Sequence, residues 1–333
     1  MDSITMSIDE ALALCQKALV ASGTEEKNAQ LVAGALLRAE AEGQKGHGLS
    51  RVPSYCAQVR TGKVNGRAVP VVEDIKPGLV RVDAGFGFAY PAIELALPEL
   101  AARAKTVGIA AAAIYHSHHF GVAGHPCEDL AQKDLLAFVY GNTPSALAPA
   151  GAKKKVLGTN PIAFGAPQAG APLIIDFAVS TVARGKIMAA KQAGKNIPEG
   201  WALGPNGKPT TDADEALRGS MLPIGGVKGA ALALLVEVMS ACLAGAALGV
   251  EASSLFDPDG APPNLGQVIL AIDAEALSGG HFSPRLVDLA AVYNSIEGAR
   301  FPGLKRLQNR RKAEEDGLSV PIALAGEIMK LAT

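Results

Sequence analysis

The sequence predicts an α/β protein in which short buried strands alternate with helices. Apolar residues make up 49% of the 333 residues but aromatic residues only 5%, and 37 residues are glycine. Small side chains of this kind let helices approach a sheet closely. Several short apolar runs are separated by longer stretches with helical patterning. The length favours two or three subdomains over one small core.

The first 63 residues are predicted to be helical. Ser7, Ile8, Asp9 and Glu10 form a capping box ahead of a helix that stops at Gly23. Thr24 is expected to cap a second helix that ends at Gly43. The glycine-rich turn "QKGHGLSR" then precedes a third helix, "VPSYCAQVRTG". His47 is therefore expected in a turn between helices, where a side chain can face a cleft.

From Val64 onward the pattern changes to strands and helices in alternation. A helix, "AIELALPELAARAKTVG", is flanked by two expected strands, and further apolar runs suit buried strands. The five expected strands are "GLVRVDAG", "GIAAAAIYHS", "LLAFVYGN", "PLIIDFAVS" and "QVILAID". Residues 283 to 333 return to a helical pattern that contains the basic stretch "FPGLKRLQNRRK".

The stretch from Gly229 to Val250, "GAALALLVEVMSACLAGAALGV", is long enough to cross a bilayer. It carries Glu237 in its middle, stands alone in the chain, and is rich in Ala and Gly. We interpret it as a buried helix packed closely on all sides and expect no membrane association.

Charge and cysteine content exclude several classes of protein. The net charge is about −1, so neither nucleic acid nor an anionic membrane is expected as the main partner. The four cysteines have no C-x-x-C spacing, which argues against a thiolate zinc site and a disulfide framework. The opening "MDSITMSIDEALALCQ" lacks the basic region of a signal peptide. A cytoplasmic location is expected.

The segment "IYHSHHFGVAGH" holds four of the six histidines. If it is a strand, alternation puts His116 and His118 on one face, as in a metal-binding pair. A zinc site, a cluster of catalytic bases and a site for an anionic ligand are all compatible with the residues alone.

Two glycine-containing segments share features with phosphate-binding motifs. "VDAGFGFAY" has a G-x-G after a strand but lacks the third glycine and the later acid of a Rossmann loop. In "PIGGVKG", Gly225, Gly226, Lys228 and Gly229 precede a helix, whose free backbone N–H groups and lysine suit an anion. A plain glycine turn with a solvated lysine is the alternative.

Polar residues elsewhere suggest a site for a small carboxylate. "IDFAVSTVARGK" places polar groups after a strand, where α/β proteins bind ligands. His47 lies between two glycines that leave room for a ligand, and Arg51 follows four residues later. An arginine there can make a forked contact to a carboxylate. A solvated surface histidine is the alternative.

Six segments, taken together and in order, resemble the malate/L-lactate dehydrogenase type-2 family over residues 5 to 325. They are "GHGLSRVPSY", "SHHFGVAG", "LGTNPIAFGAP", "IDFAVSTVARGK", "PIGGVKG" and "ARFPGLKR". Within that family, the doubled histidine of "SHHF" and the stretch "AVPVVEDIKPGLVRVDAGFGFAYPA" are most similar to Δ1-piperideine-2-carboxylate/Δ1-pyrroline-2-carboxylate reductases.

The resemblance implies a nicotinamide-binding α/β fold that differs from the Rossmann fold, with helical N- and C-terminal parts packed together. It implies a helical domain of residues 1–63 plus 283–333, which carries the catalytic histidine. Residues 64–282 would then form the α/β cofactor-binding and dimerisation region of a homodimer. No metal is expected, because the histidine segment is implied to line the cofactor.

The resemblance also implies residue roles. His47 matches the proton donor, Arg51 the substrate-binding arginine, and Thr159 a further substrate contact. The implied cofactor contacts are His119, Phe120, Gly121, Val122, Ala123, Asp176, Phe177, Ala178, Arg184, Gly185, Lys228, Arg300, Pro302, Gly303, Lys305 and Arg306. The cations Arg300, Lys305 and Arg306 favour NADPH and its 2′-phosphate over NADH.

Two departures from the family pattern concern the catalytic histidine. Gly46 stands where a serine usually precedes it, and Lys186 stands where the imine reductases carry an aspartate. Both ends of a serine–histidine–aspartate relay are therefore missing, so another group must orient His47. A nearby Lys186 would also lower the pKa of His47.

The expected function is NAD(P)H-dependent reduction of a cyclic imine carboxylate, Δ1-pyrroline-2-carboxylate to L-proline or Δ1-piperideine-2-carboxylate to L-pipecolate. A 2-oxo/2-hydroxy acid dehydrogenase acting on malate-, lactate- or sugar-acid-type substrates is the main alternative. A cofactor-binding protein without catalysis is the third reading, suggested by Gly46 and Lys186.

Overall fold

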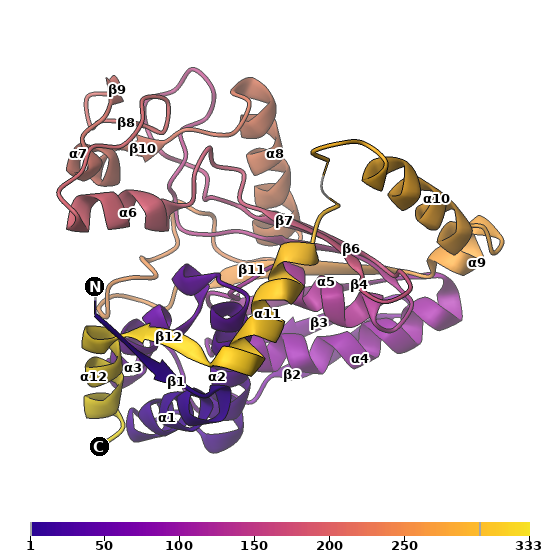
Figure 1. Ribbon diagram of the computed structural model, residues 1–333, viewed down its shortest axis with the longest axis horizontal. Helices are drawn as coiled ribbons and strands as arrows, with labels where there is room; N and C mark the ends of the chain where they lie inside the picture. The colour runs from indigo at the N-terminus through magenta and orange to yellow at the C-terminus, as the bar shows by residue number, and fades with distance from the viewer. Residues whose placement is uncertain (1, 300) are drawn as a thin grey trace.

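The computed structural model describes residues 2–299 and 301–333, and its centre is a seven-stranded sheet (Figure 1). The strand order is β2-β3-β4-β11-β5-β6-β7; β3 and β4 are parallel, and the other neighbours are antiparallel. The prediction of an α/β protein is confirmed, with a mixed sheet. The strands are β2 (Val71–Lys76), β3 (Leu79–Asp83), β4 (Ile109–Ser117), β5 (Leu136–Gly141), β6 (Ile162–Ala166), β7 (Leu173–Phe177) and β11 (Leu265–Ile272).

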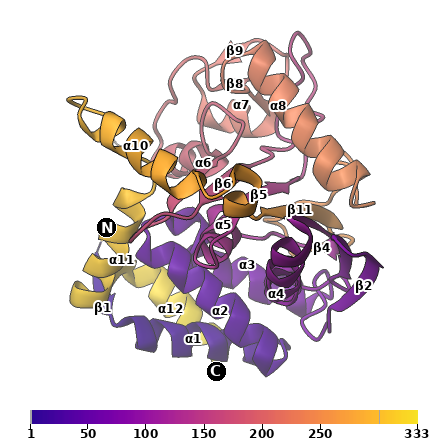
Figure 2. The same ribbon diagram turned by 90° about the vertical axis from the view of Figure 1, so that its right-hand side faces the viewer.

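One face of this sheet is covered by α4 (Ala89–Val107) and α5 (Gly124–Ala131), as both views show (Figures 1 and 2). In β4 the side chains of Ala110, Ala112 and Ile114 alternate inward and are at most 1% exposed. Alanines at these positions let α4 lie close to the strands, in accord with the small-residue composition. All five expected strands are present; β2 and β6 were not predicted.

The two ends of the chain share one hydrophobic core. Ala11, Leu36 and Tyr55 from the first helices pack in the same cluster as Val320 and Ile328. The capping box of Ser7 and Glu10 is present, but Glu25 rather than Thr24 caps the second helix, because the Glu25 carboxylate accepts from the backbone of Asn28. The elements are β1 (Ser3–Met6), α1 (Ile8–Ala21), α2 (Glu26–Ala41), α3 (Val52–Arg60), α11 (Leu304–Asp316), β12 (Leu318–Pro321) and α12 (Ile322–Leu331). β1 and β12 pair antiparallel.

A smaller unit lies beyond the other face of the sheet, drawn at the top of Figure 1. It holds a three-stranded sheet of order β10-β8-β9, which the sequence did not predict. Its elements are α6 (Arg184–Gln192), β8 (Ala202–Leu203), β9 (Pro209–Thr210), α7 (Ala213–Arg218), β10 (Ser220–Met221) and α8 (Val227–Glu237), followed by a π-helical turn (Val238–Cys242).

The interpretation of residues 229–250 as a helix buried on all sides is wrong for the single chain. α8 ends at Glu237, and Leu234, Leu235 and Leu243 are 55%, 45% and 61% exposed. Only one side of the helix packs on the rest of the chain. In the part of the chain that the structure describes, no helix combines the length and apolar character needed to cross a membrane.

The remaining helices are α9 (Ala274–Ser278) and α10 (Phe282–Asn294), which extend to one side of the molecule (Figures 1 and 2). Leu286 and Ala290 pack with Leu173 at the sheet edge. Other apolar side chains on α10 and just after it are exposed: Leu289 at 53%, Val292 at 61% and Ile296 at 55%. The tail after residue 283 thus contacts the sheet through α10 before α11 joins the N-terminal helices.

Candidate active site

Two short 3-10 turns lie directly before α3: Lys45–His47 ends at His47, and Leu49–Arg51 ends at Arg51. The Arg51 Nε donates to the Gly46 carbonyl at 2.7 Å, so the arginine and the histidine are held in one compact turn. Gly46 faces open space, as expected. Gly48 does not, because a side chain there would collide with Glu40 of α2. The second glycine therefore serves packing and does not make room for a ligand.

The group that orients His47 is another histidine. The Nδ1 of His47 lies 3.2 Å from the Nε2 of His119, and the two rings stack with an angle of 9° between their planes. The Nδ1 of His119 lies 2.5 Å from the Tyr55 hydroxyl, which lies 3.2 Å from the Tyr90 hydroxyl. His119 was predicted to contact the cofactor; here its ring holds the proposed proton donor.

This chain of hydrogen bonds occupies the Nδ1 of His47 and leaves its Nε2 as the nitrogen that can face a substrate. When His47 carries both protons, its Nδ1–H donates to His119, whose own Nδ1–H donates to Tyr55, and Tyr55 donates to Tyr90. Each donor from the Nδ1–H of His47 to the Tyr55 hydroxyl then has an acceptor. The arrangement resembles a triad in which a third group fixes the tautomer of the base. A neutral imidazole takes the place of the missing carboxylate.

The surroundings keep His47 neutral in the free protein. Burial, followed by the positive charges of Arg51 and His125, lowers the pKa of His47 to about 4. The lowered pKa was expected, but Lys186 is not among its main causes. Lys186 lies exposed on the first turn of α6.

The four clustered histidines do not share one face. β4 ends at Ser117, and His116 has a left-handed backbone with φ 48°, which breaks the alternation. His116 turns to Asp83 at 3.0 Å, His118 is 1% exposed between Tyr55 and Phe88, and His125 contacts Glu42. Among residues 2–299 and 301–333, no group of three or more His, Cys, Asp or Glu side chains is arranged to hold a metal ion.

The end of β7 brings several predicted motifs together. Asp176 accepts from the backbone N–H of Gly124 at 2.8 Å, and burial raises the pKa of Asp176. The N–H of Val179 donates to the Thr159 carbonyl, and the N–H of Ile224 donates to the Val179 carbonyl. The segments 119–124, 159–160, 176–180 and 223–226 therefore meet around one strand end.

Asn160 fixes the turn that carries Thr159. It has a left-handed backbone, is fully buried, and donates through Nδ2 to the Glu237 carboxylate and the Ala233 carbonyl. Glu237 also accepts from the backbone N–H of Gly249. The acid in the middle of the apolar segment is thus a structural anchor for the Thr159 turn.

The residues at this strand end suit a dinucleotide. Gly225 and Gly226 have positive φ and open space beside them at the N-terminus of α8, next to the exposed Lys228. Free N–H groups at a helix N-terminus and a lysine form a cradle for phosphate. Gly185 is also open, and the Nε of Arg184 is buried without a partner in the described structure.

Other predicted cofactor residues are placed differently. Phe120, Val122 and Ala123 are buried, so their side chains belong to the core and only their backbone can face a ligand. Gly121 packs against the Tyr90 hydroxyl. The remaining residues lie partly or well exposed: Phe177, Ala178, Pro302, Gly303 and Lys305. The prediction for Arg300 lies outside the described residues.

Arg306 was predicted to bind the cofactor, but it lies in a buried ionic cluster. Its guanidinium pairs with Glu42 at 2.9 Å and with Glu128 at 2.7 Å. Arg310 pairs with the same two carboxylates, and Arg38 reaches Glu128 at 2.9 Å. This cluster joins α2, α5 and α11. Two nitrogens of the cluster, the Nη1 of Arg306 and the Nε of Arg310, have no hydrogen-bond partner in the described structure.

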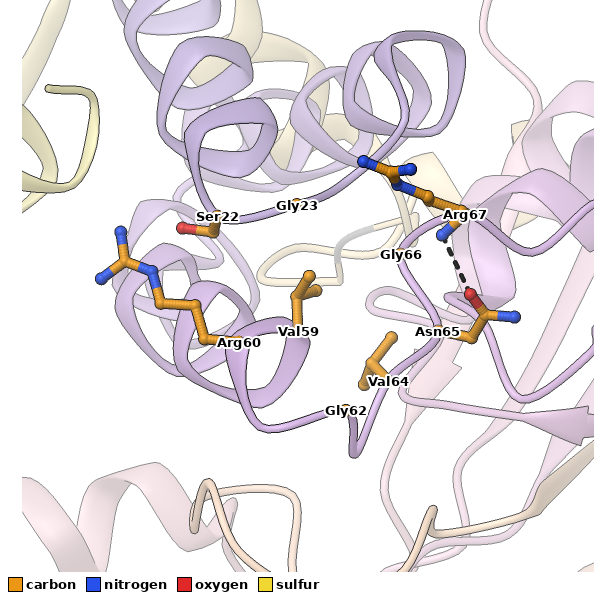
Figure 3. Close-up of a pocket in the computed structure, with 9 residues that line it drawn as sticks. All are labelled: Ser22, Gly23, Val59, Arg60, Gly62, Val64, Asn65, Gly66 and Arg67. Atoms are coloured by element: carbon orange, nitrogen blue, oxygen red, sulfur yellow. Dashed lines mark hydrogen bonds between the residues drawn. The ribbon is translucent and has the colours of Figure 1, made fainter.

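A surface hollow of about 540 Å³ lies apart from this site, between the ends of α1 and α3 (Figure 3). Arg60 and Arg67 flank it, and the N–H of Arg67 donates to the Asn65 side chain. Ser22 and Thr61 cap the C-terminal ends of these helices, where the dipole disfavours an anion. None of the predicted site residues lines this hollow.

Comparison with known proteins identifies relatives of the whole chain. The family model described as malate/L-lactate dehydrogenase matches residues 6–329. A (2R)-3-sulfolactate dehydrogenase (NADP(+)) of Chromohalobacter salexigens is 46% identical, with 98% of each chain covered. A Delta(1)-pyrroline-2-carboxylate reductase of Ancylobacter novellus is 40% identical over 99% of this chain and 98% of its own.

Solved structures match equally far. The crystal structure of delta1-piperideine-2-carboxylate reductase from Pseudomonas syringae superposes with a TM-score of 0.93 at 34% identity, covering 98% of this chain and 99% of that one. The sulfolactate dehydrogenase from Methanocaldococcus jannaschii gives 0.90 at 30% identity, covering 98% and 96%. The predicted family resemblance is confirmed.

Proposed function

The chain belongs to the malate/L-lactate dehydrogenase family, and we propose that it is an NAD(P)H-dependent reductase of a cyclic imine carboxylate. Δ1-Pyrroline-2-carboxylate, reduced to L-proline, and Δ1-piperideine-2-carboxylate, reduced to L-pipecolate, are the proposed substrates. Relatives of this name are 34–40% identical over nearly the full chain. The reading as a cofactor-binding protein without catalysis is set aside, because the relatives are named reductases and dehydrogenases.

The proposal rests on one observation: His47 and Arg51 lie in the same compact turn, and each has a free polar group, one for proton transfer and one for a carboxylate. Arg51 has no carboxylate partner among the described residues, so its guanidinium is free to hold a substrate carboxylate. His47 has a partner on Nδ1 alone, which leaves Nε2 for the reacting heteroatom. The two residues are four positions apart in one turn, which the Arg51–Gly46 hydrogen bond keeps compact, so both can act on one small molecule.

Arg51 fixes the carboxylate, and the Thr159 hydroxyl is proposed as a second contact that sets which face of the substrate is presented. Bound nicotinamide supplies the hydride. His47 exchanges a proton at Nε2, with His119 accepting from Nδ1 while the imidazole is charged. A carboxylate bound to Arg51 offsets the cation that depresses the pKa of His47, so substrate binding itself favours the protonated donor.

A second candidate is a 2-hydroxy acid dehydrogenase of the sulfolactate kind. The relative at 46% identity is a sulfolactate dehydrogenase. A second guanidinium, that of Arg184, lies near Arg51 and also has no carboxylate partner among the described residues. Two such cations suit a substrate with two anionic groups. A neutral His47 is also the correct form to accept a hydroxyl proton.

A substrate screen decides between these candidates. NADPH and NADH oxidation is measured with Δ1-pyrroline-2-carboxylate, Δ1-piperideine-2-carboxylate, pyruvate, oxaloacetate and 3-sulfopyruvate. The proposal expects the highest kcat/KM with a cyclic imine. A higher kcat/KM with 3-sulfopyruvate or oxaloacetate would replace it by the second candidate.

We propose NADPH as the preferred cofactor. Lys305 is exposed in the first turn of α11, and the relative at 46% identity is named for NADP(+). A 2′-phosphate gains from such a cation. Lys305→Ala should weaken NADPH binding more than NADH binding, and Lys312→Ala, an exposed lysine farther along α11, is the control. Equal affinities for both cofactors in the unmodified protein would contradict the preference.

We also propose a homodimer in which residues 1–63 plus 283–333 form the helical domain and residues 64–282 the cofactor-binding and dimerisation region of a non-Rossmann nicotinamide fold. Leu289 and Val292 on α10 and Ile296 just after it lie outside residues 64–282; they are more than half exposed and would add a second apolar surface that another chain can cover. Val292→Glu should shift the protein to a monomer in analytical ultracentrifugation. An unchanged mass would exclude this helix from the interface.

A further inference from the structure

Lys63 is a buried lysine without a carboxylate partner among the described residues. Its residue is 1% exposed, and its ammonium donates to three backbone carbonyls, those of Ser254 at 2.7 Å, Asp257 at 2.9 Å and Asp259 at 2.8 Å. An ammonium has three N–H donors, so each is used. A buried cation is costly unless it is satisfied in this way. The loop 254–259 is therefore organised around one side chain.

Residues at the C-terminal end of α3 also donate hydrogen bonds to this loop. The Gln58 side chain donates to the Asp257 carbonyl at 3.1 Å, and the Thr61 hydroxyl donates to the Pro258 carbonyl at 2.7 Å. Arg51 stands at the opposite end of this nine-residue helix, as its N-cap. One rigid element thus connects the substrate arginine to the lysine that holds the loop.

The loop carries Phe256 back to that arginine. The Arg51 guanidinium lies 4.8 Å from the centre of the Phe256 ring, and the Arg184 guanidinium lies 5.8 Å from the same centre. A ring face attracts a cation within about 6 Å and leaves the in-plane N–H donors of a guanidinium free. The Phe256 ring therefore contacts both the proposed substrate arginine and a proposed cofactor arginine.

We propose that Phe256 is a specificity-determining residue of the active site and that Lys63 is the positioning residue that keeps it there. The inference rests on the proposed function, since it takes Arg51 as the group that binds the substrate carboxylate. Phe256 orients the Arg51 guanidinium so that its fork faces the carboxylate. It also spaces two like-charged guanidinium groups on one neutral surface. Lys63 acts on the substrate only through this ring.

Kinetic variants test the proposal. Phe256→Leu should raise the KM for the acid substrate about 3- to 30-fold, the range of a partly desolvated cation–π contact, with kcat much less affected. Phe256→Tyr keeps the ring and should stay near the wild-type KM. Lys63→Met should raise KM to a similar extent. The double variant should be no worse than the more affected single variant, because both changes remove one contact.

Lys105→Met is the control for removal of a lysine, because Lys105 also donates to a backbone carbonyl, that of Asp134, but it is exposed at the end of α4 and pairs with Asp273. Its KM should not change. A Phe256→Leu enzyme with an unaltered KM would overturn the proposal, as would KM effects that multiply in the double variant. If Lys63→Met does not fold, the Leu and Tyr variants of Phe256 still decide the role of the ring.

Failure of this inference can be separated from failure of the proposed function. Arg51→Lys is measured in parallel. If Arg51→Lys raises KM while Phe256→Leu does not, Arg51 binds the substrate without help from the ring. If neither variant changes KM, the assignment of Arg51 itself is wrong.

Discussion

Two buried polar networks join the N-terminal helices to the rest of the chain, and they differ in how far their charges are paired. The chain from His47 through His119 and Tyr55 contains no carboxylate, and burial lowers the pKa of His119 well below its usual value. The ionic cluster of Glu42 and Glu128 contains three arginines, each paired with a carboxylate. His125 lies between them, bonded to Glu42.

This difference in charge pairing indicates that the neutral network belongs to the proposed active site and that the ionic cluster has a structural role. The neutral network keeps a free imidazole nitrogen and lies beside arginines without carboxylate partners, so it has capacity left for an anionic substrate. In the ionic cluster the charges are satisfied internally, and it holds α2, α5 and α11 together. An arginine near a site is therefore informative about ligand binding only when its own partners are known.

The largest expected effect on stability comes from breaking the ionic cluster. Glu128→Gln removes a carboxylate whose side chain is 2% exposed and leaves Glu42 as the one carboxylate paired with Arg306 and Arg310 among the described residues. Loss of one partner of a buried pair costs about 3–5 kcal/mol. Urea unfolding should show this loss, while kcat of the folded enzyme stays near wild type. Asp288→Asn, in an exposed pair with Arg285, is the control and should barely change stability.

A folded Glu128→Gln enzyme that loses activity as strongly as a catalytic variant would break the comparison. The cluster would then belong to the active site, and the prediction that Arg306 contacts the cofactor would gain support.

Arg51→Lys should weaken substrate binding next most strongly. A point ammonium cannot reproduce a forked contact, and a hydrogen bond between charged groups contributes about 1.5–3 kcal/mol. The KM for the acid substrate should therefore rise about 10- to 100-fold, with the cofactor Kd little changed. Initial-rate kinetics and cofactor titration by fluorescence measure the two quantities. An effect confined to the cofactor Kd would assign Arg51 to the nucleotide instead.

The two networks should also respond differently to acid. His118, which packs on Tyr55 of the neutral network, has a pKa that burial lowers to about 3. As the pH drops below about 6.5, the unfolded protein binds a proton at this histidine and the folded protein does not. The free energy of unfolding therefore falls. Burial opposes the ionisation of Glu42, but His125, Arg306 and Arg310 outweigh it and lower the pKa of Glu42 to about 2. Its contribution is present above about pH 4.5 and is lost toward pH 2.

Chemical unfolding from pH 8 to pH 4 measures the first loss. Continuing the series toward pH 2, with Glu42→Gln for comparison, isolates the second. The unfolding free energy should be level above pH 7 and decline below pH 6.5. A free energy that increases on acidification through pH 6 would show that the buried histidines are charged in the folded state.

The smallest effect is expected at Gly46. A side chain there meets no atom within 4 Å, and φ is not in the left-handed region, so Gly46→Ser fits without strain. Because His119 already holds Nδ1 of His47, the added hydroxyl should leave kcat unchanged or raise it slightly. Steady-state kinetics check this. A large loss of kcat would show that the open side of Gly46 is occupied by substrate or cofactor.

Local patterns predicted much of the fold but not its arrangement. The capping box, the three N-terminal helices and five of the central strands follow from short stretches of sequence. β2 and β6 were not predicted, because neither segment was among the apolar runs expected to form strands. The exposed side of α8 could not be predicted either, since apolar periodicity does not distinguish a core neighbour from a face left uncovered in the single chain.

The site was predictable only in part, for similar reasons. The turn of His47 and Arg51 could be located from its glycines and the family resemblance. The roles of Tyr55 and Phe256 could not, because each reaches the site from a helix or loop with no polar motif of its own. Arg306 lies in a basic stretch that suggested a phosphate contact, but it pairs with Glu42 and Glu128, which are distant in sequence. Pairing of that kind appears only in three dimensions.

The turnover of His47→Ala with the best substrate of the screen tests the central claim most directly. Loss of a positioned proton donor lowers kcat by roughly 10² to 10⁴. The account predicts a loss in this range, with unchanged cofactor affinity and an unfolding free energy close to wild type. Near-full turnover of a folded His47→Ala enzyme would mean that another group supplies the proton, and the assignment of His47 would be wrong.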